Sequence, residues 1–290
     1  MTYQIFQEKI IAYIKENISK NEKVFIQSVP KNNGIKLDGL VIIQDEMNIA
    51  PTIYLNYYYQ KYQEGMDFSE ICREILENYK TNKPSIPIDI HFFTDFEKIK
   101  SRIVYRLINF RQNLELLDDV PYVRFLDLAL VFYCLLPAYE EQNASIQIRM
   151  SHLDLWKTSL RELIRLSEQN TPRLLEWEIQ DMASVVEENA HLPSEDCYPM
   201  LILSNKSHLN GAGCILYKDL LKNLSRKLDM DFFILPSSVH EVILLPTKTK
   251  DAMGELSAMV KEINAAEIAR EDILSDHAYY YSGKEDRIIM

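Results

Sequence analysis

The sequence predicts an α+β fold with mixed, largely antiparallel sheets and packed helices. β-rich runs and amphipathic helical stripes follow one another without a repeating βαβ period. The dipeptide Asn33-Gly34 lies between two β-rich runs and favours the positive φ angles of a hairpin turn. The 290 residues include seven glycines, which argues against glycine-rich phosphate loops and glycine-punctuated β-sandwiches.

The first part of the chain is predicted to form a helix, a hairpin and two further helices. Apolar residues at three- and four-residue spacing indicate a helix over 5–18, and the β-rich runs 24–27 and 40–43 form the hairpin arms. The tyrosine-rich stretch 49–62 favours a helix whose tyrosines pack in a core rather than stack on bases. The D-x-x-E form at 67–70 predicts the start of a helix over 68–79.

The middle of the chain alternates short strands with helices. Two prolines mark residues 81–87 as a linker or sharp crossing. After them we expect a helix start at 94–97, and the sequence pattern indicates strands over 88–92, 103–110, 124–136 and 145–150. A helix over 151–167 is expected to end at 170–172, where a second helix over 173–189 begins.

The stretch 191–199 is the best candidate for a domain boundary because it combines Pro, Ser and Asp. The predicted regions are therefore 1–190, with a sub-boundary near 81–87, and 196–290, unless the two interleave as one domain. The last region is expected to contain helices over 217–228 and 250–264. Its expected strands are 200–205, 231–236, 240–246, 278–281 and 288–289.

Charge and composition exclude several partners. The chain carries 43 acidic and 32 basic residues, a net charge of −11, and its scattered basic residues argue against a nucleic-acid partner. It lacks the apolar runs of a membrane span, and its charged N-terminus lacks a signal-peptide pattern, so we expect a cytoplasmic protein with no membrane partner. Four cysteines without a C-x-x-C spacing argue against structural zinc or disulfides, and the sequence predicts no cofactor.

Several segments together carry a family resemblance over nearly the whole chain. They are residues 31–40, 48–55, 125–129, 170–172, 201–212 and 231–242. In these segments the sequence resembles an uncharacterised bacterial family, a domain of unknown function found in anaerobic gut bacteria. The resemblance implies a cytoplasmic protein carried on mobile elements and supplies no activity.

A polar cluster at a strand-to-turn transition is the first candidate site. Asn205, Lys206, Ser207 and Asn210 surround the dipeptide Asn210-Gly211. Such side chains on a turn could line an anion or amide pocket, with the Lys206 ammonium as a point charge. The alternative is a plain exposed turn, in which Asn, Ser and Gly are favoured for backbone reasons alone.

A second cluster offers hydroxyl, imidazole and carboxylate groups within a short stretch. Ser237, Ser238, His240 and Glu241 are present, but on a strand Ser238 and His240 share one face while Glu241 points to the other. A catalytic triad would therefore need a distant residue or a strongly bent loop, and no G-x-S-x-G elbow is present. The alternative is a hairpin turn whose serines bond backbone groups.

A third set of residues is a weak metal candidate. His240, Glu241, Asp276 and His277 have the ligand chemistry for zinc, manganese or iron, but no H-E-x-x-H pattern accompanies them, so the sequence predicts no metal site. The tyrosines at 279–281 are better explained as core or interface residues.

Two functional hypotheses follow. The favoured one is a binding or regulatory protein without catalytic activity that recognises an unknown protein or small molecule. Its ligand-binding residues are Asn205, Lys206, Asn210, Ser237, Ser238 and His240. The alternative is a hydrolase or transferase that uses Ser238 or Ser237 with His240 and Glu241. In this alternative Lys206 or Asn205 is the electrophilic stabiliser.

Overall fold

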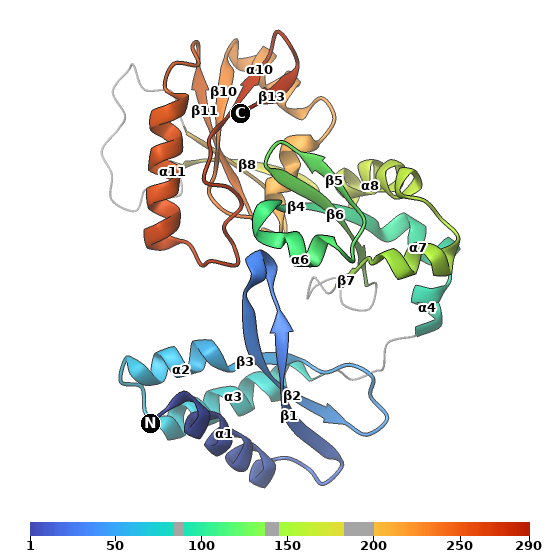
Figure 1. The fold of residues 1–290 in the computed structure, drawn as a ribbon, viewed down its shortest axis with the longest axis vertical. Helices are drawn as coiled ribbons and strands as arrows, with labels where there is room; N and C mark the ends of the chain where they lie inside the picture. The colour runs from blue at the N-terminus through green and yellow to red at the C-terminus, as the bar shows by residue number, and fades with distance from the viewer. Residues whose placement is uncertain (84–89, 137–144, 183–199) are drawn as a thin grey trace. The chain divides into compact units, whose positions relative to one another are not determined.

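The computed structural model describes residues 1–83, 90–136, 145–182 and 200–290 (Figure 1). The chain divides into two compact units, one comprising 1–31 and 35–90, the other 32–34 and 91–290. Every strand pair among the described residues is antiparallel, and helices accompany three sheets, which confirms the α+β class. None of the described helices has the length and apolarity needed to cross a membrane.

The first unit packs three helices around a three-stranded sheet. Its helices are α1 (Tyr3–Asn17), α2 (Leu55–Gln63) and α3 (Phe68–Asn82), and its strands are β1 (Glu22–Pro30), β2 (Lys36–Gln44) and β3 (Thr52–Tyr54). The apolar stripes predicted from helical spacing are buried: Phe6, Ile10 and Ile71 are fully covered. Asp67 caps α3 by accepting a hydrogen bond from the Ser69 amide.

The hairpin between β1 and β2 confirms the turn expected at Asn33-Gly34. The two strands pair from Glu22 opposite Gln44 to Pro30 opposite Lys36. Asn33 and Gly34 have φ angles of 59° and 68°, the left-handed conformation that these two residue types tolerate best.

The second unit contains two sheets. The six-stranded sheet has the order β13-β12-β10-β11-β9-β8, and the smaller sheet pairs β4, β5 and β7 with β6. The strands of the large sheet are β8 (Trp177–Asp181), β9 (Leu201–Asn205), β10 (Asp231–Pro236), β11 (Val242–Thr247), β12 (Tyr279–Ser282) and β13 (Arg287–Ile289). Those of the small sheet are β4 (Ile103–Asn109), β5 (Tyr122–Phe125), β6 (Leu128–Leu135) and β7 (Ser145–Gln147).

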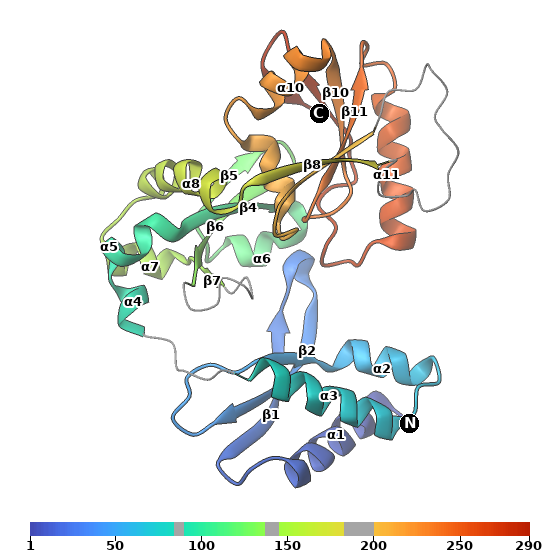
Figure 2. The same cartoon turned by 180° about the vertical axis from the view of Figure 1, so that it is seen from behind.

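The centre of the large sheet is buried on both faces, because the residues of β10 alternate between two cores. Phe232 and Ile234 of β10 join a core shared with the small sheet, whereas Phe233 and Leu235 face α11 (Met253–Glu267). Figure 2 shows α11 lying along this face of the sheet. The double burial explains why β10 has an unbroken apolar run instead of an alternating pattern.

The remaining helical segments of the second unit are short, except for α8. They are α4 (Ile90–Thr94), α5 (Phe96–Ile99), α6 (Leu114–Leu117), α7 (Met150–Trp156), α8 (Leu160–Leu174) and α10 (Leu220–Leu228). Short 3₁₀ segments occur at Asn32–Gly34, Lys100–Arg102, Arg111–Asn113 and Gly211–Leu216.

Two strand predictions in the middle of the chain are wrong. The described part of 88–92 belongs to the helix α4 rather than to a strand. The run 124–136 is not one strand but the hairpin of β5 and β6, with Phe125 opposite Leu128. Leu126 adopts a φ of 54° in this two-residue turn. Leucine rarely takes this conformation, so the sequence pattern did not predict a turn here.

The helix predictions around residues 151–189 also need correction. The helix expected over 151–167 is broken at Lys157, whose φ is 52°, into α7 and α8. α8 then continues through Pro172 to Leu174, and within the helix expected over 173–189 residues Trp177–Asp181 form the strand β8. Tertiary contacts explain the continuation: Asn170 bonds the carbonyl oxygens of Lys100 and Ile103 and so anchors the last turn of α8.

The boundary expected at 191–199 lies outside the described residues, so the division into 1–190 and 196–290 stays a prediction. On either side of residues 183–199, β8 and β9 pair within the same sheet, with Ile179 opposite Leu203.

Candidate functional site

Sheet topology brings the two predicted loop segments together. β9 pairs antiparallel with β11, with Leu203 opposite Val242. Because the strands run in opposite directions, the residues that follow β9 lie beside those that precede β11. The Ser204 hydroxyl donates a 2.8 Å hydrogen bond to the His240 carbonyl and ties the two segments to each other.

Gly211 permits this close approach of the two segments. A Cβ atom at position 211 would lie 2.5 Å from the His240 carbonyl oxygen and 2.7 Å from the Asn205 amide nitrogen, and it would also collide with Ser204 Oγ. Two of these three atoms belong to the backbone, so no side-chain rotation can relieve the clash. The contact between the two segments therefore requires glycine at position 211.

The Asn205 side chain shapes the loop 205–210 from within. It is 1% exposed, and its Oδ1 accepts hydrogen bonds from the Ser207 hydroxyl at 2.7 Å and the Leu209 amide at 3.2 Å. Its Nδ2 donates to the Leu209 carbonyl at 2.8 Å. The amide group is thus engaged at both ends, and its contribution to a binding surface is to hold the loop in shape.

In the exposed part of the loop, Lys206 and His208 each lie beside a carboxylate of β8 or of the residue before it. Lys206 Nζ lies 2.7 Å from Glu176 Oε2, and His208 Nε2 lies 3.6 Å from Glu178 Oε2. The hydrogen bond to Glu176 raises the pKa of Lys206. Both groups of the Lys206 pair are 63% exposed, so water screens their attraction and a ligand could reach them.

His240 connects three segments of the second unit. Its Nδ1 accepts a 3.2 Å hydrogen bond from the Asn210 amide, and its Nε2 lies 3.4 Å from Asp272 Oδ1. Because Nδ1 accepts this bond, the proton of the neutral ring sits on Nε2 and faces the Asp272 carboxylate. With both nitrogens engaged, the imidazole acts as a clamp between the loop 205–210 and the residues around 272.

The serines beside His240 bond to backbone and carboxylate groups. Ser238 Oγ accepts a 3.0 Å hydrogen bond from the His240 amide, and Ser237 Oγ lies 3.4 Å from Glu241 Oε1. Neither hydroxyl is bonded to the His240 imidazole in the described structure. A serine nucleophile needs a hydrogen bond to its base, so this arrangement supports a structured turn more than an acyl-transfer centre.

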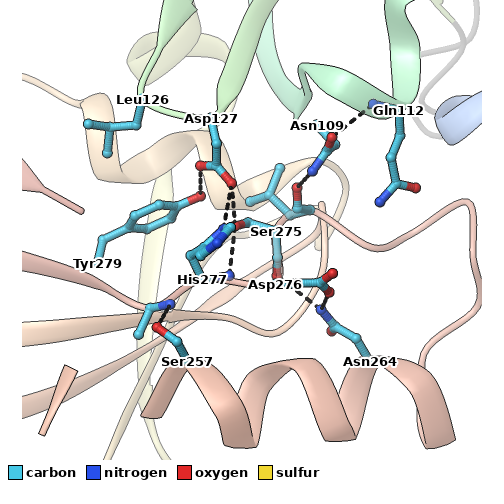
Figure 3. A network of polar contacts seen from close by, with 12 residues as sticks. Asn109, Gln112, Leu126, Asp127, Ser257, Asn264, Ser275, Asp276, His277 and Tyr279 are labelled. Atoms are coloured by element: carbon cyan, nitrogen blue, oxygen red, sulfur yellow. Dashed lines mark hydrogen bonds and ion pairs between the residues drawn. The ribbon is translucent and has the colours of Figure 1, made fainter. Parts of the chain in front are cut away.

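A polar network around Asp127 involves residues that the sequence patterns did not bring together (Figure 3). Asp127 Oδ1 accepts a 2.7 Å hydrogen bond from the Tyr279 hydroxyl, and Oδ2 accepts one of 2.7 Å from Ser275. His277 Nδ1 lies 3.2 Å from the same Oδ2, and its backbone amide donates to Ser275 Oγ. The sequence feature that could have identified Asp127 is its place immediately before the apolar strand β6.

In the Asp127–His277 pair, the carboxylate orients an imidazole that lies at the surface. The His277 side chain is 54% exposed and that of Asp127 17%, so the carboxylate holds the inner edge of the ring. In the tautomer that carries its proton on Nδ1, the ring donates a hydrogen bond to Asp127, and Nε2 is able to accept one. Ser275 is bonded to the carboxylate rather than to the imidazole, so this Asp, His and Ser do not form a nucleophile–base chain.

Comparison with known proteins assigns the chain to a family. Residues 3–283 match DUF5688, which is described as a family of unknown function. The chain belongs to this family. No curated protein and no solved structure matches it, so the geometry of the DUF5688 chain itself carries the functional argument.

Each tyrosine of the triplet in the DUF5688 chain donates its hydroxyl hydrogen to a different carboxylate. Tyr279 bonds Asp127, Tyr280 bonds Asp231, and Tyr281 bonds Asp286 at 2.7 Å. Burial, followed by the hydrogen bond to Asp231, raises the pKa of Tyr280 to about 12. Burial together with Asp127 likewise raises the pKa of Tyr279. These tyrosines therefore serve packing and polar anchoring, as the sequence predicted for core residues.

The candidate metal ligands of the DUF5688 chain are distributed over separate contacts. His240 faces Asp272, His277 faces Asp127, and Asp276 Oδ1 accepts a hydrogen bond from Asn264. Within 1–83, 90–136, 145–182 and 200–290, no group of three metal-ligating side chains gathers.

Three buried cysteines of the DUF5688 chain are free thiols. They are Cys72, Cys134 and Cys214, whereas Cys197 lies outside the described residues. Burial raises the pKa of Cys72 to about 11 and the pKa values of Cys134 and Cys214 to about 12. Protonated, buried thiols are poor nucleophiles and poor metal ligands.

Proposed function

We propose that this DUF5688 chain is a binding or regulatory protein without catalytic activity. Its recognition surface comprises the loop 205–210 and the segment 236–241, and its partner is a protein or a small molecule. Lys206 and His208 supply the exposed contacts, while Asn205, Asn210, Ser237, Ser238 and His240 hold the two segments in place.

The engagement of both His240 ring nitrogens is the observation that carries this proposal. The Asn210 amide occupies Nδ1, and Asp272 faces Nε2. A surface whose loops are fixed before binding loses less conformational freedom when a ligand arrives, which favours recognition. A general base, in contrast, needs a nitrogen that is free to take a proton from a reacting group.

A hydrolase or transferase that uses Ser238 or Ser237 with His240 and Glu241 has weaker support. In that reading a serine hydroxyl would donate to the imidazole, and a carboxylate would orient the ring. Asp272 faces the ring as an orienting group would, but Ser238 Oγ receives the His240 backbone amide instead. Among the described residues, no hydrogen bond joins a serine hydroxyl of this segment to the His240 imidazole, and a serine nucleophile requires that bond.

A cytoplasmic location is part of this proposal. Free thiols at Cys72, Cys134 and Cys214 are typical of a reducing compartment, in which disulfides are rare. The sequence resemblance further supports a bacterial origin, in gut anaerobes and on mobile elements.

The test compares the surface with a matched control. A chain carrying Lys206→Glu and His208→Ala is used as bait in a native cell lysate beside the wild type and Lys250→Glu. Both Lys206 and Lys250 are exposed, so these changes are expected to shift the melting temperature very little. Proteins and small molecules retained by each bait are identified by mass spectrometry.

The expected result is a partner that wild type and Lys250→Glu retain and the double variant loses. An identical set of retained molecules on all three baits would overturn the proposed recognition surface. Hydrolysis of an ester or phosphoester substrate that disappears in Ser238→Ala, with folding intact, would favour the catalytic alternative instead.

A further inference from the structure

The edge of the large sheet at β8 presents unpaired backbone groups among the described residues. Lys206 donates its amide to the Glu176 carbonyl, and Met182 donates its amide to the Met200 carbonyl. In an antiparallel pair the hydrogen-bonded positions alternate, so the even-numbered residues of β8 face β9. The amide and carbonyl groups of Trp177 and Ile179 therefore point away from the sheet.

An apolar groove runs beside this edge. It has a volume of about 550 Å³ and is lined by Trp177 and Ile179 of β8, Leu220 and Leu224 of α10, and Tyr217. Trp177 is 44% exposed, and its indole N–H has no acceptor among the described residues. A large exposed indole beside a groove is typical of a binding anchor.

Two cations complete the groove. Lys218 and Lys227 line it, and the structure gives neither ammonium a carboxylate partner among the residues that it describes. Nearby Lys222, in contrast, is paired with Asp286 at 2.5 Å. In a chain of net charge −11, two unpaired lysines at one apolar groove make a local surface of opposite sign.

We propose that β8 and this groove bind an extended, acidic segment of a partner protein. The segment adds to the sheet as a strand, with its backbone paired to Trp177 and Ile179. Its inward side chains are apolar in the centre, against Trp177 and Leu224. They are acidic at the ends, because Lys218 precedes α10 and Lys227 lies in the last turn of this helix. When a peptide adds to a sheet edge as a strand, its backbone hydrogen bonds provide affinity, and pockets for its side chains provide specificity. The groove is a different surface from the loops of the proposed function.

Three synthetic peptides test the charge requirement and the chemistry of the groove. The probe is the fluorescein-labelled heptapeptide ETVTVTE, in which the inward face of the strand carries acidic ends and an apolar centre. KTVTVTK reverses the end charges, and ETSTSTE removes the apolar centre. Fluorescence anisotropy measures the three affinities for the full chain. We expect ETVTVTE to bind at least about tenfold more tightly than either control peptide.

Backbone methylation of the probe distinguishes strand addition from simple groove binding. Methylating the amides at positions 3 and 5 or those at positions 4 and 6 gives two peptides of the same composition. A strand paired along one side loses binding in one of these peptides and retains it in the other. Equal binding of both peptides would show that no strand pairing occurs and would overturn the proposal.

Variants of the protein place the site. Trp177→Ala should weaken ETVTVTE by about 30-fold, as expected for a central aromatic anchor. Lys218→Glu with Lys227→Glu should reverse the preference toward KTVTVTK. Lys250→Glu serves as the control, because this exposed lysine does not line the groove and its substitution should leave the peptide affinity unchanged. Circular dichroism confirms that each variant is folded.

Three further results would refute this assignment. They are absence of ETVTVTE binding at millimolar peptide, unchanged affinity in Trp177→Ala, and a wild-type dimer that Trp177→Ala dissociates. The last would show that a second copy of the chain covers the groove. Since Lys206 and His208 are untouched in the groove variants, this failure is distinguishable from failure of the loop surface.

Discussion

The Tyr279 hydroxyl donates a 2.7 Å hydrogen bond to Asp127, a residue 152 positions earlier in the chain. Asp127 lies in the turn between β5 and β6 of the small sheet, and Tyr279 lies in β12 of the large one. The bond therefore joins the two sheets at the edge of their common core. Ser275 and His277 add further contacts to the same carboxylate, which makes Asp127 the centre of the junction.

Removing the Tyr279 hydroxyl should destabilise the second unit. Tyr279→Phe keeps the ring in its buried place but removes a hydrogen bond to a carboxylate, so the free energy of unfolding should fall by about 1.5–3 kcal/mol. Urea denaturation measures the change. Tyr122→Phe, at a tyrosine that is 37% exposed, is the control and should leave the stability within about 0.5 kcal/mol of wild type. Equal effects of the two substitutions would contradict the role of Asp127.

Alkaline pH should destabilise the fold because the pKa of Tyr280 is higher in the folded state than in the unfolded state. Burial and Asp231 raise the pKa of Tyr280 to about 12, whereas an unfolded tyrosine has a pKa of about 10. Between these values the unfolded state loses its proton first, so the free energy of unfolding falls as pH rises from 10 to 12. Urea titrations at intervals across this range check the slope, and Tyr280→Phe should make it shallower. A stability that stays level to pH 12 would contradict the prediction.

Two glycines should respond oppositely to alanine. Gly211→Ala places a methyl group against the His240 carbonyl and the Asn205 amide, so it should destabilise the protein by about 1–3 kcal/mol or more. Gly254→Ala meets no atom within 4 Å in α11 and should stabilise by up to about 1 kcal/mol, because alanine loses less backbone freedom. Thermal unfolding of both variants decides the matter. A neutral Gly211→Ala would show that the two loops separate readily.

Arg106 is expected to be a destabilising residue. Burial lowers the pKa of its guanidinium to about 10, and its Nε has no hydrogen-bond partner in the described part of the chain. The group stacks 4.0 Å above the Tyr133 ring. Arg106→Met keeps this packing without a desolvated charge and should stabilise the protein by about 1 kcal/mol or more. Exposed Arg111→Met is the control, with no expected change. A loss of stability in Arg106→Met would contradict this prediction.

Local sequence patterns predict elements well where their signals are strong and short-ranged. The Asn33-Gly34 turn and the apolar stripe of α3 both occur as expected, because a turn residue or a helical period decides them locally. The extension of α8 through Pro172 does not follow from local preference. Its last turn is held by side-chain bonds from Asn170 to the backbone of a segment about 70 residues away.

The candidate site shows the same division between local and distant causes. Sequence patterns singled out the loops 205–210 and 236–241, and sheet pairing brings them into contact through Ser204 and His240. The partners of the two histidines could not be read in this way. Asp272 meets His240 from a separate segment, and Asp127 meets His277 from 150 residues away.

The alternating backbone of β8 has a consequence for isotope exchange with solvent. Amide hydrogens of Glu178 and Gln180 point to β9 and should exchange for deuterium slowly, whereas those of Trp177 and Ile179 should exchange quickly. The slowly exchanging amides of Glu178 and Gln180 thus serve as a reference for those of Trp177 and Ile179 in the same strand. Slowing at Trp177 and Ile179 alone would report that a neighbouring strand has joined the sheet, at single-residue resolution and without any label.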